Sequence, residues 1–461
     1  MKLSQLASPA WALYLTQAAA TPRPKCEIDV DVAIIGGGSA GVHAAINLKD
    51  AGVTFAVIEK KNQIGGHAET YTDPKTLVPA NVGVVVFENT ETVGNYFSRL
   101  NVSTIKTNPS PPLNASAAAA QQAALQAAVQ AYSANVLTKY PWIDQGFLVP
   151  HPVPEELTIP FGELAQKYNF TALLTINAQF NWYTGDISTI PALYGIKNLG
   201  PGLLNSIFGE FIVSANGDTR ALYNAAAKEL GDSVLLNATV VEVKRDVKIG
   251  KHTTGVTVRV QQPNQPPKLI RARKLLVAIP PTLENVGAYD LTADEKTLFS
   301  KFSTVGYWAA VATIPGLNTS LTNVGLRTPF NQPVIPGPNG FSSYGSPGDF
   351  LVSVGFDSTN YTTADAEAIL RKNLATLAAV GGVPKNAVET MTVPFSSDHG
   401  PFNLRVSAEE IKAGFYSKFL ALESKRNTYW AGAVFTGHNS GLVWKFNEGT
   451  VLPALKKDLG L

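Results

Sequence analysis

The stretch DVAIIGGGSAGVHAAINL, residues 31–48, decides the fold. Its glycines are spaced as Gly36-x-Gly38-x-x-Gly41, directly after a run of strand-forming residues and directly before a helical pattern of small residues. In this arrangement the first glycine makes a tight turn, the second lets the backbone approach a pyrophosphate, and the third lets the helix pack closely on the strand. The phosphates would lie on the free N–H groups at the start of the helix. The stretch therefore predicts a β-α-β unit that binds a dinucleotide.

An acidic residue after the next strand narrows the choice of dinucleotide. The apolar run VTFAVIE ends at Glu59, 18 residues after Gly41. A carboxylate at this position accepts hydrogen bonds from both ribose hydroxyls and repels a 2′-phosphate. The pattern disfavours NADP and leaves NAD and FAD.

Composition excludes several other classes of function. The chain has 461 residues, enough for roughly two to three domains. Its net charge is +2 without a basic run, so we expect no nucleic acid and no anionic membrane surface as partner. No segment after the N-terminus offers the roughly 20 apolar residues of an integral membrane helix. The single cysteine, Cys26, and six scattered histidines predict no metal site. No protein partner can be identified from the sequence.

The N-terminus has the layout of a secretory signal. Residues 1–20 combine an early lysine, a modest apolar stretch and an Ala18-Ala19-Ala20 end, which predicts a signal peptide cleaved after Ala20. Because Ser8 and Pro9 interrupt the apolar stretch, an amphipathic or disordered tail is the alternative. Six Asn-x-Ser/Thr sequons agree with a secreted glycoprotein. They begin at Asn101, Asn114, Asn169, Asn237, Asn318 and Asn360.

Strand and helix patterns divide the chain into interleaved pieces. Residues 28–88, 212–298 and 425–461 read as one discontinuous α/β domain that binds the dinucleotide. The two insertions, 89–211 and 299–424, are expected to form a second, α+β domain that binds the substrate.

Four motifs in a fixed order distinguish FAD from NAD. They are GGGSAG with Glu59, IGGHAET at 64–70, LLVAIPPTL at 275–283 and YWAGAVFTGHNSG at 429–441. Their order and spacing resemble the flavin-containing amine oxidase superfamily over nearly the whole chain. The C-terminal block is similar to a fungal branch that includes β-cyclopiazonate dehydrogenase. The residues that carry this similarity are Tyr429, Trp430, His438, Asn439, Ser440 and Trp444.

The resemblance implies an α/β fold, FAD as cofactor and a set of contacts to it. The fold would be a Rossmann-like FAD-binding domain, as in amine oxidases and glutathione reductase, with an inserted α+β substrate domain. Gly65 and Gly66 would let the backbone pass the pyrophosphate. His67 stands where the family has arginine, and we expect it to donate to phosphate; a solvent-exposed loop histidine is the alternative. The helix that begins at Ser440 would stabilise the anionic reduced flavin. The predicted contacts are Gly36, Gly38, Ser39, Ala40, Gly41, Glu59, Lys60, Gly65, Gly66, His67, Gly83, Val84, Val240, Gly432, Ser440, Gly441, Leu442 and Val443.

The chain departs from the amine oxidase pattern at the catalytic positions. The lysine that holds a water against the flavin is replaced by Ala309 or Ala310, and an aromatic wall of the amine cage by Leu442. A simple alkyl-amine oxidase is therefore disfavoured.

Other polar and aromatic residues remain near the expected flavin position. The polar residues expected nearest the ring, and hence the predicted catalytic residues, are His438, Asn439 and His399. His399 lies where some relatives attach flavin covalently, which is a second hypothesis for it. Tyr307, Trp308 and Tyr344 are expected either to wall the substrate or to pack in the core.

Three hypotheses of function follow. The first is a secreted FAD-dependent oxidase that takes a hydride from a small apolar or aromatic metabolite, with O₂ as acceptor and H₂O₂ as product. The second is a redox-neutral flavin-dependent double-bond isomerase of a fatty acid or similar lipid. The third is a flavin-binding protein without turnover. O₂ consumption during turnover separates the first two.

Overall fold

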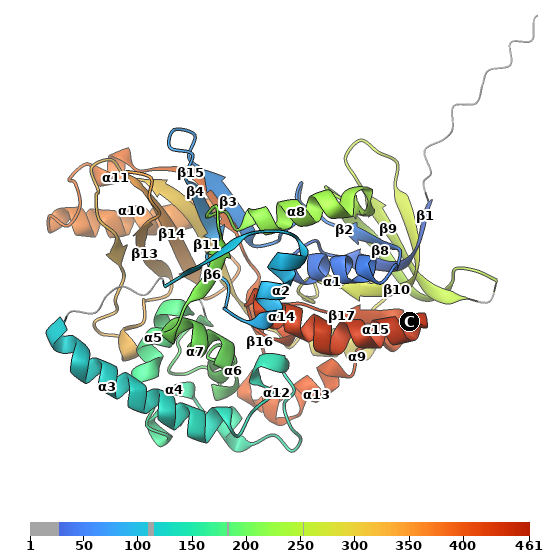
Figure 1. Ribbon diagram of the computed structural model, residues 1–461, viewed down its shortest axis with the longest axis horizontal. Helices are drawn as coiled ribbons and strands as arrows, with labels where there is room; N and C mark the ends of the chain where they lie inside the picture. Colours follow the sequence, from blue (N-terminus) through green and yellow to red (C-terminus); the bar gives the residue numbers. More distant parts are fainter. Residues whose placement is uncertain (1–26, 109–114, 182–183, 252) are drawn as a thin grey trace, which may run out of the picture.

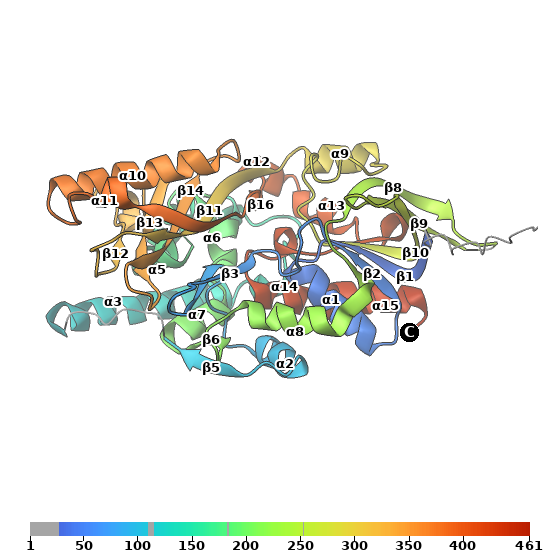
Figure 2. The same cartoon turned by 90° about the horizontal axis from the view of Figure 1, so that it is seen from above.

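The computed structural model describes residues 27–108, 115–181, 184–251 and 253–461 (Figure 1). The predicted signal peptide, residues 1–20, and the sequon at Asn114 lie outside the described residues. The described chain forms two large sheets with helices around them, seen from two directions in Figures 1 and 2.

A seven-stranded sheet is built around the N-terminal strand. Its order is β7-β2-β1-β10-β9-β8, and β17 also pairs with β10. Strands β2, β1, β10 and β17 run parallel. The centre of β1 is buried, as expected for a parallel strand covered on both faces. The bounds are β1 Glu27–Ile35, β2 Phe55–Ile58, β7 Val234–Leu235, β8 Thr239–Lys248, β9 Thr254–Gln261, β10 Lys268–Val277 and β17 Thr428–Trp430.

Helices from both ends of the chain lie beside this sheet. Helix α1 (Ser39–Asp50) follows β1 directly, and α14 (Ser440–Phe446) and α15 (Leu452–Leu459) lie alongside it (Figure 1). The Trp444 indole donates to the Ser39 carbonyl at 3.3 Å, and Asn447 Nδ2 donates to the Ala40 carbonyl at 2.9 Å. Hydrogen bonds thus join the C-terminal helical segment to the beginning of α1. The other helices near this sheet are α2 Glu91–Arg99, α8 Arg220–Leu230 and α9 Ala293–Phe299.

The second sheet has the order β12-β13-β14-β11-β15, with β16 also paired to β11. Successive side chains of β11 point to opposite faces. Trp308 and Ala310 pack in a core with helix α10, whereas Tyr307 and Ala309 pack against β4. The bounds are β11 Ser303–Thr313, β12 Leu321–Thr322, β13 Gly337–Ser343, β14 Asp349–Phe356, β15 Thr392–Asp398, β16 Phe402–Arg405, α10 Thr363–Ala379 and α11 Ala387–Thr390.

The remaining elements connect the sheets, and most of these helices gather below the second sheet in Figure 1. Their hydrophobic residues belong to the same core as the seven-stranded sheet. The bounds are β3 Ala68–Thr72, β4 Pro79–Gly83, β5 Thr104–Thr107, β6 Phe211–Ser214, α3 Ala115–Tyr132, α4 Phe161–Lys167, α5 Ala172–Phe180, α6 Ala192–Lys197, α7 Pro201–Phe208, α12 Ala408–Lys412 and α13 Phe415–Leu420.

The strands follow the predicted division of the chain. To within one residue, the seven-stranded sheet takes its strands from 28–88, 212–298 and 425–461, and the second sheet from 299–424. The helices of the insertion 89–211 share one core with the seven-stranded sheet and with residues of the segment 299–424. Because this core crosses the expected boundaries, the domain boundaries stay a prediction. Among the described residues, no helix is both long and apolar enough to cross a membrane.

Candidate cofactor and active site

Two glycines in the turn between β1 and α1 are required by the packing of the surrounding backbone. Gly36 has φ +105°, and a Cβ there would lie 2.7 Å from Ile279 Cγ2 and 2.8 Å from the Ala278 carbonyl oxygen. A Cβ at Gly41 would lie 1.9 Å from the Gly36 carbonyl oxygen. The AIPP segment therefore packs on the turn, and helix α1 approaches β1 as closely as glycine permits.

Gly38, in contrast, has no such role within the protein. Its φ is −78°, which any residue adopts, and a Cβ would meet only Gly66 Cα at 3.7 Å, an ordinary contact. Helix α1 begins without a capping side chain or an acidic residue in its first turn. Among the described residues, the backbone N–H groups of Ser39, Ala40 and Gly41 have no acceptor. The helix start is thus open to an anion, and Gly38 keeps the approach to it clear.

The two glycines of IGGH lie directly on this helix start. Gly65 and Gly66 have φ +121° and +61°, and the Gly65 N–H donates to the Gly37 carbonyl at 2.8 Å. Arg220, the first residue of α8, donates to the Ile64 carbonyl at 2.9 Å and to that of Ala68 at 3.0 Å. Its guanidinium reaches within 2.9 Å of a Cβ built on Gly65. Arg220 is therefore the cation beside the glycine loop. Sequence reasoning missed it because it lies in a distant helix without a motif.

Glu59 stands where a ribose-binding carboxylate is expected. It is buried, and its two oxygens accept from the N–H groups of Gly37 and Lys61, each at 2.8 Å. Each oxygen keeps a lone pair for a further hydroxyl donor. The Lys60 side chain is exposed. Val240 follows Ala238, whose N–H donates to the Glu59 carbonyl, and a β-bulge falls between Val240 and Glu242. The bulge removes backbone groups from the ladder at the position predicted for adenine.

Helix α14 supplies a second helix start to the same region. Asn439 caps it, because Oδ1 accepts from the Leu442 N–H at 3.2 Å and Nδ2 donates to Glu88 Oε1 at 2.7 Å. Among the described residues, the N–H groups of Ser440 and Gly441 have no acceptor. Burial, with the nearby charge of Asp144, raises the pKa of Glu88 to about 8. Both ends of the Asn439 amide are therefore engaged in the structure, one of them in capping the helix, and its predicted catalytic role stays a prediction.

Three of the six histidines form a buried group, which we call the histidine cluster: His67, His399 and His438. The His67 ring centroid lies 4.8 Å from that of His399 and 6.2 Å from that of His438. Burial lowers the pKa of all three, to about 4 for His67, so they are neutral at pH 7. His67 and His438 nevertheless keep some exposed surface, which means that they border a space open to solvent.

The members of the histidine cluster differ in their hydrogen bonds. His438 Nε2 accepts from the Asn403 N–H at 2.9 Å. His399 is 1% exposed, and neither of its ring nitrogens has a hydrogen-bond partner of good geometry among the described residues. The Val82 backbone lies near enough to His399 to raise its pKa, against the larger lowering by burial. A Cβ on Gly83 (φ +122°) would lie 2.8 Å from His399 Cε1, so the glycine brings β4 against this ring.

The cluster corrects one of the two readings of His67. The expectation of a solvent-exposed loop histidine is wrong, because its ring packs between His399 and Phe402. Its donation to phosphate stays a prediction, and Arg220, which lies against Gly65, is a second donor near that position.

The face of β11 resolves which alanine replaces the family lysine. Ala309 lies with Tyr307, Phe402 and β4, on the side of the histidine cluster, whereas Ala310 faces α10. Tyr344 packs against the same group as Ala309. Trp308 is wrong as a substrate wall, because it is buried under α10. The surface next to the histidine cluster is therefore aromatic and aliphatic.

The residues present fit FAD. The starts of α1 and α14 offer N–H groups without acceptors, and Glu59 offers carboxylate oxygens. Gly432 has φ +119° with nothing within 4 Å of a Cβ, so space is left beside the start of α14. The hydroxyls of Ser39 and Tyr223 are buried without well-formed hydrogen bonds, although Ser39 lies near enough to lower the Tyr223 pKa against the raising effect of burial. These groups are therefore available to form hydrogen bonds with polar atoms of a bound cofactor.

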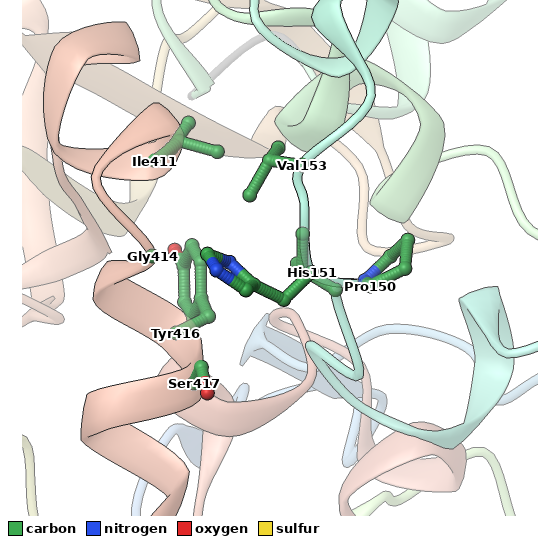
Figure 3. Close-up of a pocket in the computed structure, with 8 residues that line it drawn as sticks. Pro150, His151, Val153, Ile411, Gly414, Tyr416 and Ser417 are labelled. Atoms are coloured by element: carbon green, nitrogen blue, oxygen red, sulfur yellow. The ribbon is translucent and has the colours of Figure 1, made fainter.

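Two hollows are small: one lies away from the site, and the other lies at the start of α14 itself, where Gly441 and Leu442 line it. Figure 3 shows a crevice in which His151 and Val153 face Ile411 and Tyr416 across a gap with no room for a water-sized ligand. A pocket of about 190 Å³ opens beside α14 and is lined by Glu88, Asp144 and Lys445 among others. Neither is large enough for a dinucleotide.

Comparison with known proteins agrees with this geometry. A family model described as an NAD(P)-binding Rossmann-like domain matches residues 34–100. The FAD-dependent oxidoreductase dpchF of Colletotrichum higginsianum is 65% identical over 478 residues, covering 100% of both chains. The chain belongs to the fungal FAD-dependent oxidoreductases. β-Cyclopiazonate dehydrogenase of Aspergillus oryzae is 33% identical, covering 91% of this chain and 92% of its own.

Solved structures show how this oxidoreductase folds. A CLA-producing fatty acid isomerase from P. acnes has a TM-score of 0.72 at 18% identity, covering 92% of this chain and 98% of its own. Wild-type putrescine oxidase bound to putrescine has a TM-score of 0.60 at 15% identity, covering 93% and 100%. These likenesses confirm the predicted flavin amine oxidase fold. FAD as cofactor and the oxidoreductase class are confirmed by the relatives, and the hypothesis of a protein without turnover is set aside.

Proposed function

We propose that this oxidoreductase is an oxidase that takes a hydride from a carbon of a small apolar or aromatic metabolite and passes the electrons to O₂. When bound, FAD supplies the hydride acceptor and the route of the electrons to O₂. The observation that carries the proposal is His399, a neutral, buried imidazole whose ring nitrogens have no well-formed hydrogen bond, next to an aromatic and aliphatic surface.

His399 is the residue we assign as proton acceptor. Loss of a hydride from a carbon that bears a hydroxyl or an amine also requires removal of a proton from that heteroatom. A neutral imidazole can accept it, and the lowered pKa of His399 keeps it neutral over the physiological range. His438 is less suited, because its Nε2 already accepts from the Asn403 N–H and its remaining proton lies on Nδ1.

The surrounding side chains orient the substrate and exclude water. The ring of Phe402 lies 3.7 Å from that of His438 and 5.0 Å from that of Tyr307, centroid to centroid. Ala309 adds no polar group to this face. An apolar or aromatic body fits such a surface, which supports an uncharged reacting end of the substrate.

The oxidase proposal can be tested without knowing the substrate. The purified holoprotein is photoreduced anaerobically and then mixed with air-saturated buffer, with free FAD treated in the same way as control. We expect reoxidation clearly faster than that of free FAD, with one H₂O₂ formed per flavin. Reoxidation no faster than free FAD would overturn the oxidase proposal. It would favour the redox-neutral isomerase, for which the alanine in place of the family lysine is equally suitable.

The second hypothesis for His399, a covalent bond to flavin, has its own test. Acid precipitation of the holoprotein separates the cases, because a covalent flavin stays with the pellet and a non-covalent one goes to the supernatant. We expect colour in the supernatant, since His399 then remains available as proton acceptor. Colour in the pellet that disappears in His399→Ala would contradict the proposed role.

We also propose that the protein is secreted and glycosylated. The five sequon asparagines among the described residues (101, 169, 237, 318 and 360) are all exposed, which glycan attachment requires. Expression of the full chain in a yeast, with its own N-terminus, should place the protein in the medium and give a mobility shift on removal of N-glycans. Retention in the cytosol without such a shift would contradict the proposal.

A further inference from the structure

Arg405 stands out because it is half-buried and, among the described residues, has no acidic partner. Of the buried and half-buried arginines that the structure describes, the others except Arg220 lie within 4.0 Å of a carboxylate. Arg220 lies against the glycine loop, at the position predicted for the pyrophosphate. Arg405 Nη1 donates to the Thr184 carbonyl, and this is the one hydrogen bond seen for its guanidinium among the described residues.

The surroundings of Arg405 do not neutralise its charge. Burial lowers its pKa, and the hydroxyl of Tyr194, whose own pKa is raised to about 12, is neutral at pH 7. An arginine stays cationic in proteins, so the charge persists without a counter-ion. Removing a charge from water without a partner is costly, which suggests that the partner comes from outside the chain.

Further polar groups without partners lie next to it. Thr184, whose carbonyl accepts from Arg405, is 2% exposed, and its hydroxyl has no hydrogen-bond partner in the part of the chain that the structure describes. Asn403, two residues before Arg405 on β16, has a buried side-chain NH₂ without an acceptor. The guanidinium and the NH₂ of the amide donate only, and the hydroxyl can donate, so an oxygen-rich anion is the group that would satisfy these donors.

Strand β16 connects these groups to the proposed reaction site. Phe402, at the beginning of β16, packs on His438, and the Asn403 N–H donates to that same histidine. Arg405 is three residues further along the chain, so its Cα lies within roughly 11 Å of that of Phe402, although Asn403 (φ +50°) interrupts the extended backbone between them. A small organic molecule with its reacting carbon at the histidine cluster can span such a distance.

We propose that Arg405, with the hydroxyl of Thr184 and the amide of Asn403, forms a subsite for an anionic oxygen group, such as a carboxylate, at the far end of the substrate. The substrate class is then an apolar or aromatic body that carries one anionic group, away from the reacting carbon. This rests on the proposed function for its reacting end, but the subsite can be tested as an equilibrium, without turnover.

The test is a titration of the holoprotein with benzoate, followed by the visible flavin spectrum and by calorimetry, with the neutral isostere benzamide as comparison. We expect saturable binding of benzoate in preference to benzamide. Arg405→Met should weaken benzoate binding about 10- to 100-fold, which corresponds to the loss of one charge-assisted hydrogen bond. Arg405→Lys keeps the charge but not the planar guanidinium, so its affinity for benzoate should lie between those of the wild type and Arg405→Met. This variant replaces Arg405→Met in the test if Arg405→Met does not hold flavin.

Arg371→Met is the matched control. Arg371 is also half-buried and donates to backbone carbonyls, but it lies on α10, on the far side of the second sheet, and has Glu367 as partner. It should leave benzoate binding unchanged. Equal affinity for benzoate and benzamide in the wild type, or equal benzoate affinity in wild type and both Arg405 variants, would overturn the subsite. Slow flavin reoxidation with Arg405-dependent benzoate binding would instead overturn the oxidase proposal alone.

Discussion

Replacement of Gly38 by alanine should separate cofactor binding from folding. A Cβ at Gly38 meets only Gly66 Cα at 3.7 Å, so the fold has room for it. The poorer N-cap costs up to ~1 kcal/mol, and the stiffer unfolded chain returns about 0.4–1 kcal/mol. The free energy of unfolding should therefore stay nearly unchanged. The methyl group, however, would lie beside Gly66 at the start of α1, where we expect it to push a phosphate away.

The expected loss of affinity follows from that displacement. Losing one charge-assisted hydrogen bond, worth about 1.5–3 kcal/mol, weakens FAD binding roughly 10- to 100-fold. The assay is a fluorescence titration of the deflavinated protein with FAD, together with its melting temperature. Unchanged FAD affinity in Gly38→Ala would refute the assignment of the α1 helix start as the phosphate site.

Gly41→Ala is the contrasting variant. Its Cβ would lie 1.9 Å from the Gly36 carbonyl oxygen, so helix and strand must move apart. Overpacking of this kind costs about 1–3 kcal/mol or more, and the better helix propensity of alanine offsets only about 1 kcal/mol. This variant should melt at a lower temperature and also bind FAD poorly. Equal melting temperatures for the two variants would show that the glycines have the same role.

Three other perturbations test separate parts of the structure. Glu59→Gln replaces one accepting oxygen with a donor that faces a backbone N–H, so the FAD dissociation constant should rise at least ~10-fold. An unchanged dissociation constant in the same titration would argue against ribose binding by Glu59. Arg245→Met removes the partner of buried Glu295 and of Asp290, so denaturant unfolding should show a loss of about 3–5 kcal/mol, and a loss below ~1 kcal/mol would count against it. His67 has a pKa of about 4 when folded, below the 6.5 of the unfolded chain, so its contribution is complete above pH 6.5 and is lost as the pH falls to about 4. Between pH 6.5 and pH 4 the free energy of unfolding should therefore fall by on the order of 2 kcal/mol more in the wild type than in His67→Asn. Parallel pH profiles of the two proteins would contradict this.

The parts of the site that local sequence could predict are those made by neighbouring residues. Gly36 and Gly41 act on the same turn, and their steric roles follow from a motif of six residues. Glu59 follows the next strand, so its position relative to the turn is also set locally. The order of the later motifs was sufficient to indicate FAD.

The parts that sequence could not predict depend on packing between distant segments. Arg220 reaches the glycine loop from α8, and nothing in its local sequence marks it. The choice between Ala309 and Ala310 requires the phase of β11 relative to two packing partners, since successive residues of a strand face opposite sides. The sequence predicts Asn439 as a reacting group, and the hydrogen bonds of its amide to the Leu442 N–H, which caps α14, and to Glu88 become visible only in the structure.

The joining of α14 to the start of α1 has a consequence for biosynthesis. Strand β1 has β10 as a direct neighbour, and the second helix start comes from residues 440–441, close to the end of the chain. Because the ribosome adds about 5–20 residues per second, β10 is synthesised on the order of 10–50 s after the N-terminal β-α-β unit. The cofactor can be enclosed only after that, when the last helices have docked. Flavin must therefore be present in the compartment where folding is completed, and for an exported chain that compartment is the secretory pathway.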